Sequence, residues 1–98
     1  QYMATLHDRG AGLSRVVYVK GSVEALLRRC DSAVDAAGHS TPLAPDEVYA
    51  AVAKLAGHGL RVLALAHKVV PDETTAIRHS DIGAGLAFLG LQAMIDPP

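Results

Sequence analysis

Residues 16–24 constrain the fold more than any other segment of this sequence. The run Val-Val-Tyr-Val is β-branched and aromatic and predicts a strand, which ends at Lys20. Gly21 lets the backbone turn, and Ser22 is a residue type that begins helices. The segment therefore predicts a strand that passes directly into a helix, with an ammonium group beside the helix N-terminus. This junction suits an anionic ligand, although a solvated lysine at a strand end is the commoner explanation of these residues alone.

Two helices are predicted from residue spacing. The first begins after Ser22 and is expected to continue through Cys30, followed by a loop over residues 31–44. The second is indicated more clearly, because Pro45 suits the first helical position and acidic residues occupy the first turn. Apolar residues then recur at positions 48, 52, 55 and 56 until Gly57-His58-Gly59 ends the run.

Strand patterns occupy much of the remaining chain. Residues 2–7 and 15–20 flank a glycine-rich turn and are predicted to pair as an antiparallel hairpin. Two more strands are predicted over residues 61–70 and 85–95, with Gly90 as a bulge or a close approach. A polar connection with room for one helical turn opens at residues 71–73. The resulting order predicts an α+β fold, an antiparallel β-sheet with helices against one or both faces.

Composition narrows the functional classes. The 98 residues suffice for at most one small domain, and with only 4% aromatic residues small aliphatic side chains must fill its core. A formal net charge of −1 gives no electrostatic reason to expect nucleic acid or direct contact with an anionic membrane. No apolar run reaches the roughly 20 residues that span a bilayer. Cys30 is the only cysteine, which excludes an internal disulfide and indicates a reducing compartment.

Residues with catalytic chemistry are sparse. Lys20 ends one apolar strand and Arg61 begins another, and the guanidinium of an arginine suits bidentate phosphate contacts, but each is also typical of a solvated surface. The five histidines lack metal-ligand spacing, so no metal site is predicted. Cys30 is expected in the core rather than as a nucleophile. No catalytic residue is therefore assigned.

Three segments together resemble the nucleotide-binding domain of P-type cation-transporting ATPases, particularly the calcium-pump-like branch. Lys20-Gly21-Ser22-Val23-Glu24 is similar to the family's Lys-Gly-Ala/Ser-Pro-Glu motif. Residues 60–66 resemble its Leu-Arg-x-Leu-Ala strand, and residues 90–98 resemble its Gly-Met-Leu/Ile-Asp-Pro-Pro-Arg hinge. Order and spacing match over nearly the whole chain. A valine replaces the usual proline at position 23, which is expected to alter the helix start more than the pocket.

The resemblance implies that residues 1–95 are part of a nucleotide-binding domain and that residues 96–98 begin the hinge to an absent phosphorylation domain. Motif matching implies ATP-contacting roles for six residues: Gln1, Met3, Lys20, Gly21, Arg61 and Leu63. Lys20 would line the adenine pocket and bring positive charge into it, and Gly21 would let the backbone approach the ligand. Arg61 would contact phosphate oxygens.

Leu63 would pack near the base, and Met3 would sit on the pocket strand. Gln1 falls near a position that is often lysine in the family. The family's adenine-stacking phenylalanine lies upstream of the first residue here, so ATP binding is expected to be weak.

The resemblance also implies partners and a cellular setting. The ligand would be ATP as Mg-ATP, with no metal held by these residues, and the protein partners would be the phosphorylation and actuator domains of the same chain. The parent protein would be an enzyme that couples ATP hydrolysis, through an aspartyl-phosphate in another domain, to cation transport across a membrane. This segment would be cytoplasmic and non-catalytic, because it has no Asp-Lys-Thr-Gly-Thr motif. Both ends are expected to be cuts in a longer polypeptide.

One alternative from another class remains open at this point. The chain could be a non-catalytic α+β protein-interaction module in which Lys20 and Arg61 are merely solvated. That alternative predicts no response to nucleotide and a self-complementary surface that causes concentration-dependent sedimentation.

Overall fold

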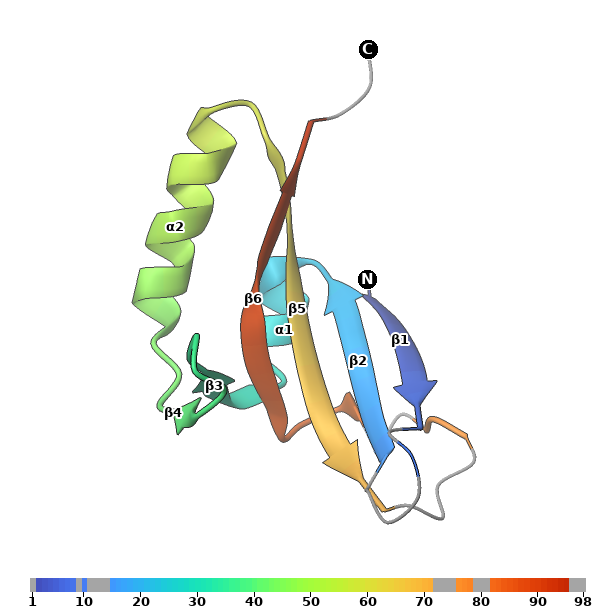
Figure 1. Ribbon diagram of the computed structural model, residues 1–98. Helices are drawn as coiled ribbons and strands as arrows, with labels where there is room; N and C mark the ends of the chain where they lie inside the picture. Colours follow the sequence, from blue (N-terminus) through green and yellow to red (C-terminus); the bar gives the residue numbers. More distant parts are fainter. Residues whose placement is uncertain (1, 9, 11–14, 72–75, 79–81, 96–98) are drawn as a thin grey trace.

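The computed structural model describes residues 2–8, 10, 15–71, 76–78 and 82–95, which form one six-stranded sheet and two helices (Figure 1). The elements in chain order are β1 (Tyr2–His7), β2 (Arg15–Gly21), α1 (Val23–Leu27), β3 (Cys30–Val34), β4 (Ser40–Thr41), α2 (Pro45–Gly57), β5 (Arg61–Val70) and β6 (Leu86–Met94). The strands lie in the order β1-β2-β5-β6-β3-β4, which can be followed from right to left in Figure 1. Residues 96–98, expected to begin a hinge, and residues 72–73 of the polar connection lie outside the described residues.

The α+β class is confirmed, with one parallel pair in an otherwise antiparallel sheet. β1 pairs antiparallel with β2, β2 with β5 and β5 with β6, so the predicted hairpin is confirmed. β3, however, pairs parallel with β6. The physical reason is the crossover through α1, which returns the chain so that β3 runs in the same direction as β2.

The segment between the two helices differs from its prediction. α1 ends at Leu27, so the expectation that it continues through Cys30 is wrong. The predicted loop over residues 31–44 contains β3 and β4. The sequence Cys-Asp-Ser-Ala-Val of β3 has weak strand propensity, and its backbone becomes a strand because β6 and β4 offer hydrogen-bonding partners on both sides.

Other predicted elements are confirmed close to their expected bounds. α2 spans Pro45–Gly57, with Asp46 and Glu47 in its first turn, and it begins without a side-chain cap at Ala44. β5 spans Arg61–Val70 as expected. Gly90 lies at a bulge: it is opposite Leu65, and the next residue of β5 is opposite Phe88, so the register shifts there.

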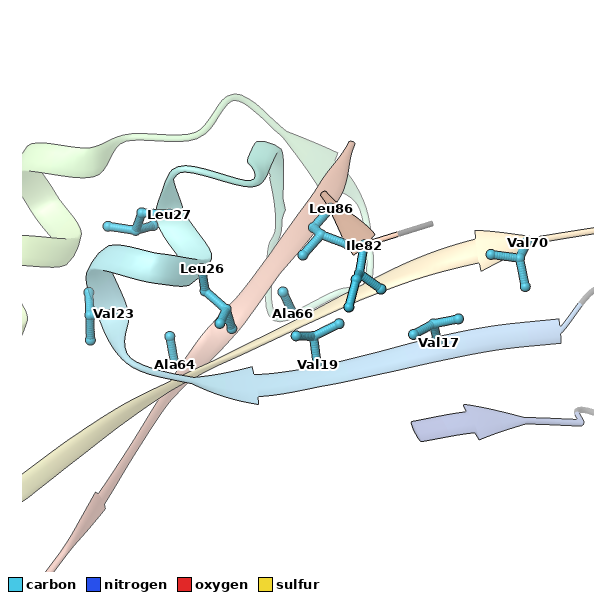
Figure 2. Packing of buried hydrophobic residues seen from close by; sticks show 10 residues of the cluster. All are labelled: Val17, Val19, Val23, Leu26, Leu27, Ala64, Ala66, Val70, Ile82 and Leu86. Carbon is cyan, nitrogen blue, oxygen red and sulfur yellow. The ribbon is translucent and has the colours of Figure 1, made fainter. Parts of the chain in front are cut away.

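The core lies between α1 and one face of the sheet (Figure 2). Leu26 is fully buried and points from α1 toward β2 and β5. It packs in a cluster whose buried members are aliphatic: Val17, Val19, Val23, Leu26, Leu27, Ala64, Ala66, Val70, Ile82 and Leu86. Val48 and Val52 of α2 pack against the same cluster. Both helices therefore lie on one side of the sheet, and small aliphatic residues fill the core as the composition predicts.

Candidate functional site

A cavity of about 410 Å³ lies where β2 passes into α1, beside β1 and the beginning of β5. Its lining comprises Tyr2, Met3, Lys20, Gly21, Ser22, Arg61 and Leu63. Five of the six residues predicted to contact a nucleotide thus lie around one cavity, although they come from three separate segments. The sixth, Gln1, lies outside the described residues.

Strand register explains why these residues meet. Residues opposite each other in neighbouring strands project from the same face of a sheet. Met3 is opposite Lys20 in the β1–β2 pair, and Lys20 is opposite Leu65 in the β2–β5 pair. Leu63 and Arg61 precede Leu65 by two and four residues, and therefore project from that face as well. The cavity consequently opens on the face opposite the core.

Exposure within the cavity divides the lining into two kinds of side chain. Met3 has 70% of its surface exposed and Arg61 is also exposed, whereas Lys20 and Leu63 are half-buried. The half-buried stem of Lys20 can lie along apolar neighbours while its ammonium reaches water or an anion. The described lining residues include no Asp, Glu, His or Cys, and the charged side chains among them are those of Lys20 and Arg61. This arrangement favours an anionic ligand with an apolar part.

The junction with α1 is formed as the sequence predicts. Ser22 is extended and its Oγ accepts a hydrogen bond of 3.3 Å from the Ala25 N–H, which caps the helix. α1 has only five residues, so few aligned peptide dipoles stand behind its N-terminus. The two side-chain cations, rather than the helix, therefore account for the positive character of the cavity.

Two lining residues were not predicted from the sequence. Tyr2 precedes Met3 on β1 and is opposite Gly21, and Ser22 belongs to the junction expected to suit an anion but is not among the residues expected to contact ATP. Their proximity to Lys20 depends on the β1–β2 register, which the hairpin prediction alone did not specify.

A second cavity, of about 370 Å³, extends along the same face of the sheet. It shares Met3 and Lys20 with the first cavity and is otherwise lined by Thr5, Tyr18, Val19, Leu65, Ala66 and Leu89. A third, of about 410 Å³, lies between α2 and β6, and Glu47 is the titratable residue among its described lining residues. The described residues that line it include no lysine or arginine, and none of them is a predicted site residue.

The described residues contain neither a cluster of metal ligands nor a membrane-spanning helix. Within those ranges, no three or more His, Cys, Asp and Glu side chains lie close enough to hold a metal ion. In the part of the chain that is described, no helix is both long and apolar enough to cross a membrane.

Cys30 lies half-buried at the start of β3 and packs against the core. Burial, and secondly the negative charge of Asp31, raise the pKa of its thiol from 9.0 to about 11. Because the thiolate is the nucleophilic form, this environment disfavours a catalytic role at neutral pH.

We expect Cys30 to react with iodoacetamide at pH 8 about tenfold or more slowly in the folded chain than in the urea-unfolded chain, since each pKa unit removes about nine-tenths of the thiolate. The raised pKa also implies a pH dependence. The contribution of this thiol to stability is retained below pH 9.0 and is lost as the pH rises toward about 11. Equal alkylation rates in the folded and unfolded chains would contradict the raised pKa of the Cys30 thiol.

The family model and the individual relatives that match this chain point to the same family. The family model described as P-type ATPase, cytoplasmic domain N, matches residues 1–98. Cation-transporting ATPase pma1 of Synechocystis sp. is 53% identical over 98 residues, covering 100% of this chain and 10% of that protein. The probable cation-transporting ATPase F of Mycobacterium tuberculosis is 41% identical, covering 100% of the chain and 11% of that protein.

Calcium-transporting ATPase 1 of Lactococcus lactis is 33% identical over 98 residues, covering 98% of this chain and 11% of that protein. The chain thus spans about a tenth of the length of these curated relatives. The family match extends over every segment that forms the cavity. This chain belongs to the P-type cation-transporting ATPases, within their cytoplasmic domain N.

Proposed function

We propose that this chain binds ATP as the nucleotide-binding part of a cation-transporting P-type ATPase. The observation that carries the proposal is the convergence of Met3, Lys20, Gly21, Arg61 and Leu63 around one cavity. The motif resemblance in the sequence implies the same residues independently of any cavity. The cavity volume of about 410 Å³ lies within the usual range of small-molecule sites, roughly 300–1,000 Å³.

The chemistry of the lining suits the two parts of a nucleotide. Lys20 and Arg61 supply positive charge for phosphate oxygens, and an arginine can donate two parallel hydrogen bonds to one phosphate. Met3 and Leu63 supply apolar surface for a base. Gly21 has no side chain, so the ligand can approach the backbone there.

In this proposal the chain positions the nucleotide and does not cleave it. Among the described residues that line the cavity there is no carboxylate or histidine to activate water, and the phosphate acceptor would be an aspartate in another domain of the same polypeptide. ATP would arrive as Mg-ATP, with the metal carried by the phosphates. Residues 96–98 would begin the connection to the phosphorylation domain, and the closed assembly, with the actuator domain, would couple hydrolysis to cation transport.

Binding by this chain alone should be weak, because the site is open and the phosphorylation domain, which would contribute the other side of the closed site, is not part of this chain. We expect a dissociation constant for ATP of about 1 mM or weaker, equivalent to roughly −4 kcal/mol or less favourable. An NMR titration measures this directly, with adenosine as the comparison ligand. ATP should bind more tightly than adenosine, because only ATP engages both cations. Absence of saturable shifts at high millimolar ATP would contradict the proposal.

A further inference from the structure

Arg29 makes an unusual set of contacts just after α1. Its carbon Cζ lies 4.8 Å from the centroid of the Tyr2 ring, within the range of a cation–π interaction. One of its guanidinium nitrogens, Nη1, donates a 2.6 Å hydrogen bond to the carbonyl of Ala25 in α1. The Nε atom is buried and has no hydrogen-bond partner among the described residues. The guanidinium is thus held between α1 and the first described residue of β1.

The main-chain position of Arg29 is also fixed on both sides. Its N–H donates to the carbonyl of Leu26, and its carbonyl accepts from the Leu86 N–H of β6 at 2.9 Å. Arg29 therefore links an anchored backbone to the ring of Tyr2. A buried Nε without a partner is costly, so its retention here calls for a compensating interaction. The contact with the aromatic ring supplies one.

The start of β1 has particular need of such a link. Among the described strands β1 lies at the edge of the sheet and pairs only with β2, so its backbone is held by hydrogen bonds from one side. Tyr2 lines the candidate cavity and is followed by Met3, which also lines it. If β1 separated from β2 at this end, the wall opposite Lys20 and Gly21 would open.

We propose that Arg29 is a positioning residue for the nucleotide cavity: by holding the Tyr2 ring against α1, it fixes the start of β1 and so keeps Met3 in the wall of the site. Arg29 does not itself line the cavity, and it acts through Tyr2. The effect on ATP binding rests on the function proposed above, whereas the effect on β1 does not.

The test combines hydrogen exchange with ATP titration on the 98-residue chain. Arg29→Met removes the charge and keeps an apolar side chain, and it should accelerate amide exchange in residues 3–5 about three- to tenfold, the range expected for losing a partly desolvated cation–π contact. Exchange in β5 should not change. The ATP affinity of Arg29→Met should fall by a similar factor. Arg29→Lys keeps a cation over the ring and should retain most of the wild-type ATP affinity.

Arg28→Met is the matched control, because Arg28 is an exposed neighbour and its replacement changes the net charge equally. It should leave both measurements unchanged. In a double-mutant cycle, Arg29→Met should have little further effect once Tyr2→Leu has removed the ring. Additive effects of the two substitutions, or equal behaviour of the Arg29 and Arg28 variants, would overturn the proposal. If the wild-type chain did not bind ATP, the proposed function would fail, and the exchange data would still decide whether Arg29 holds β1.

Discussion

Replacing Lys20 with methionine is expected to weaken ATP binding about tenfold, equivalent to about 1.4 kcal/mol. Methionine keeps much of the apolar stem that lies along the sheet and removes the charge. Hydrogen bonds to charged groups contribute about 1.5–3 kcal/mol, and partial exposure of Lys20 to solvent places the expected value at the lower end. Adenosine binding should change little, because adenosine has no phosphate. NMR titrations of both ligands measure the two effects.

Lys54→Met provides the matched control for this prediction. Lys54 is exposed in the last turn of α2 and does not line the cavity, yet its replacement changes the net charge by the same amount. ATP affinity should therefore be nearly unaffected by this substitution. Equal losses in the two variants would mean that ATP responds to overall charge rather than to a site at Lys20. The Lys20 effect should also diminish at high ionic strength, because part of the interaction is screened.

Leu26→Ala is expected to lower the free energy of unfolding by about 3 kcal/mol. Leu26 is fully buried between α1 and the sheet, and its removal would leave a cavity lined by small aliphatic side chains that cannot collapse into it (Figure 2). Domains of this size have total stabilities of about 5–15 kcal/mol, so the loss is a large fraction of the total. Urea unfolding followed by circular dichroism measures it.

Leu55→Ala is the comparison substitution for the core. Leu55 lies on α2, in which no residue is fully buried, and the same side-chain truncation there should cost about 1 kcal/mol. A smaller effect at Leu26 than at Leu55 would contradict the assignment of the core to the α1 side of the sheet. Leu26 does not line the cavity. Leu26→Ala should therefore weaken ATP binding only under conditions in which part of the chain population is unfolded.

Local signals were sufficient for most of the fold. Pro45, the acidic first turn and the glycines after residue 56 predicted α2 because caps and spacing act within one element. β5 and the β1–β2 hairpin were likewise evident from apolar runs and a turn. β3 and β4 were not, because their short sequences become strands only through pairing: β3 pairs with distant β6, and β4 pairs with β3. The parallel direction of β3 follows from the same long-range contact.

The candidate site was predictable to a similar extent. The motif matches selected Met3, Lys20 and Arg61, and these residues lie around one cavity. The involvement of Tyr2 depends on the strand register, and its contact with Arg29 depends on where the chain lies as it leaves α1. Neither arrangement has a local signature, since both arise from the mutual placement of segments that are far apart in the sequence.

The most direct test of the central claim is a map of amide shifts during ATP titration of the isotope-labelled chain. The account predicts saturable shifts at Met3, at Lys20 and Gly21, and at Leu63, with little change along α2. Shifts confined to the groove between α2 and β6, or no shifts at high millimolar ATP, would contradict it.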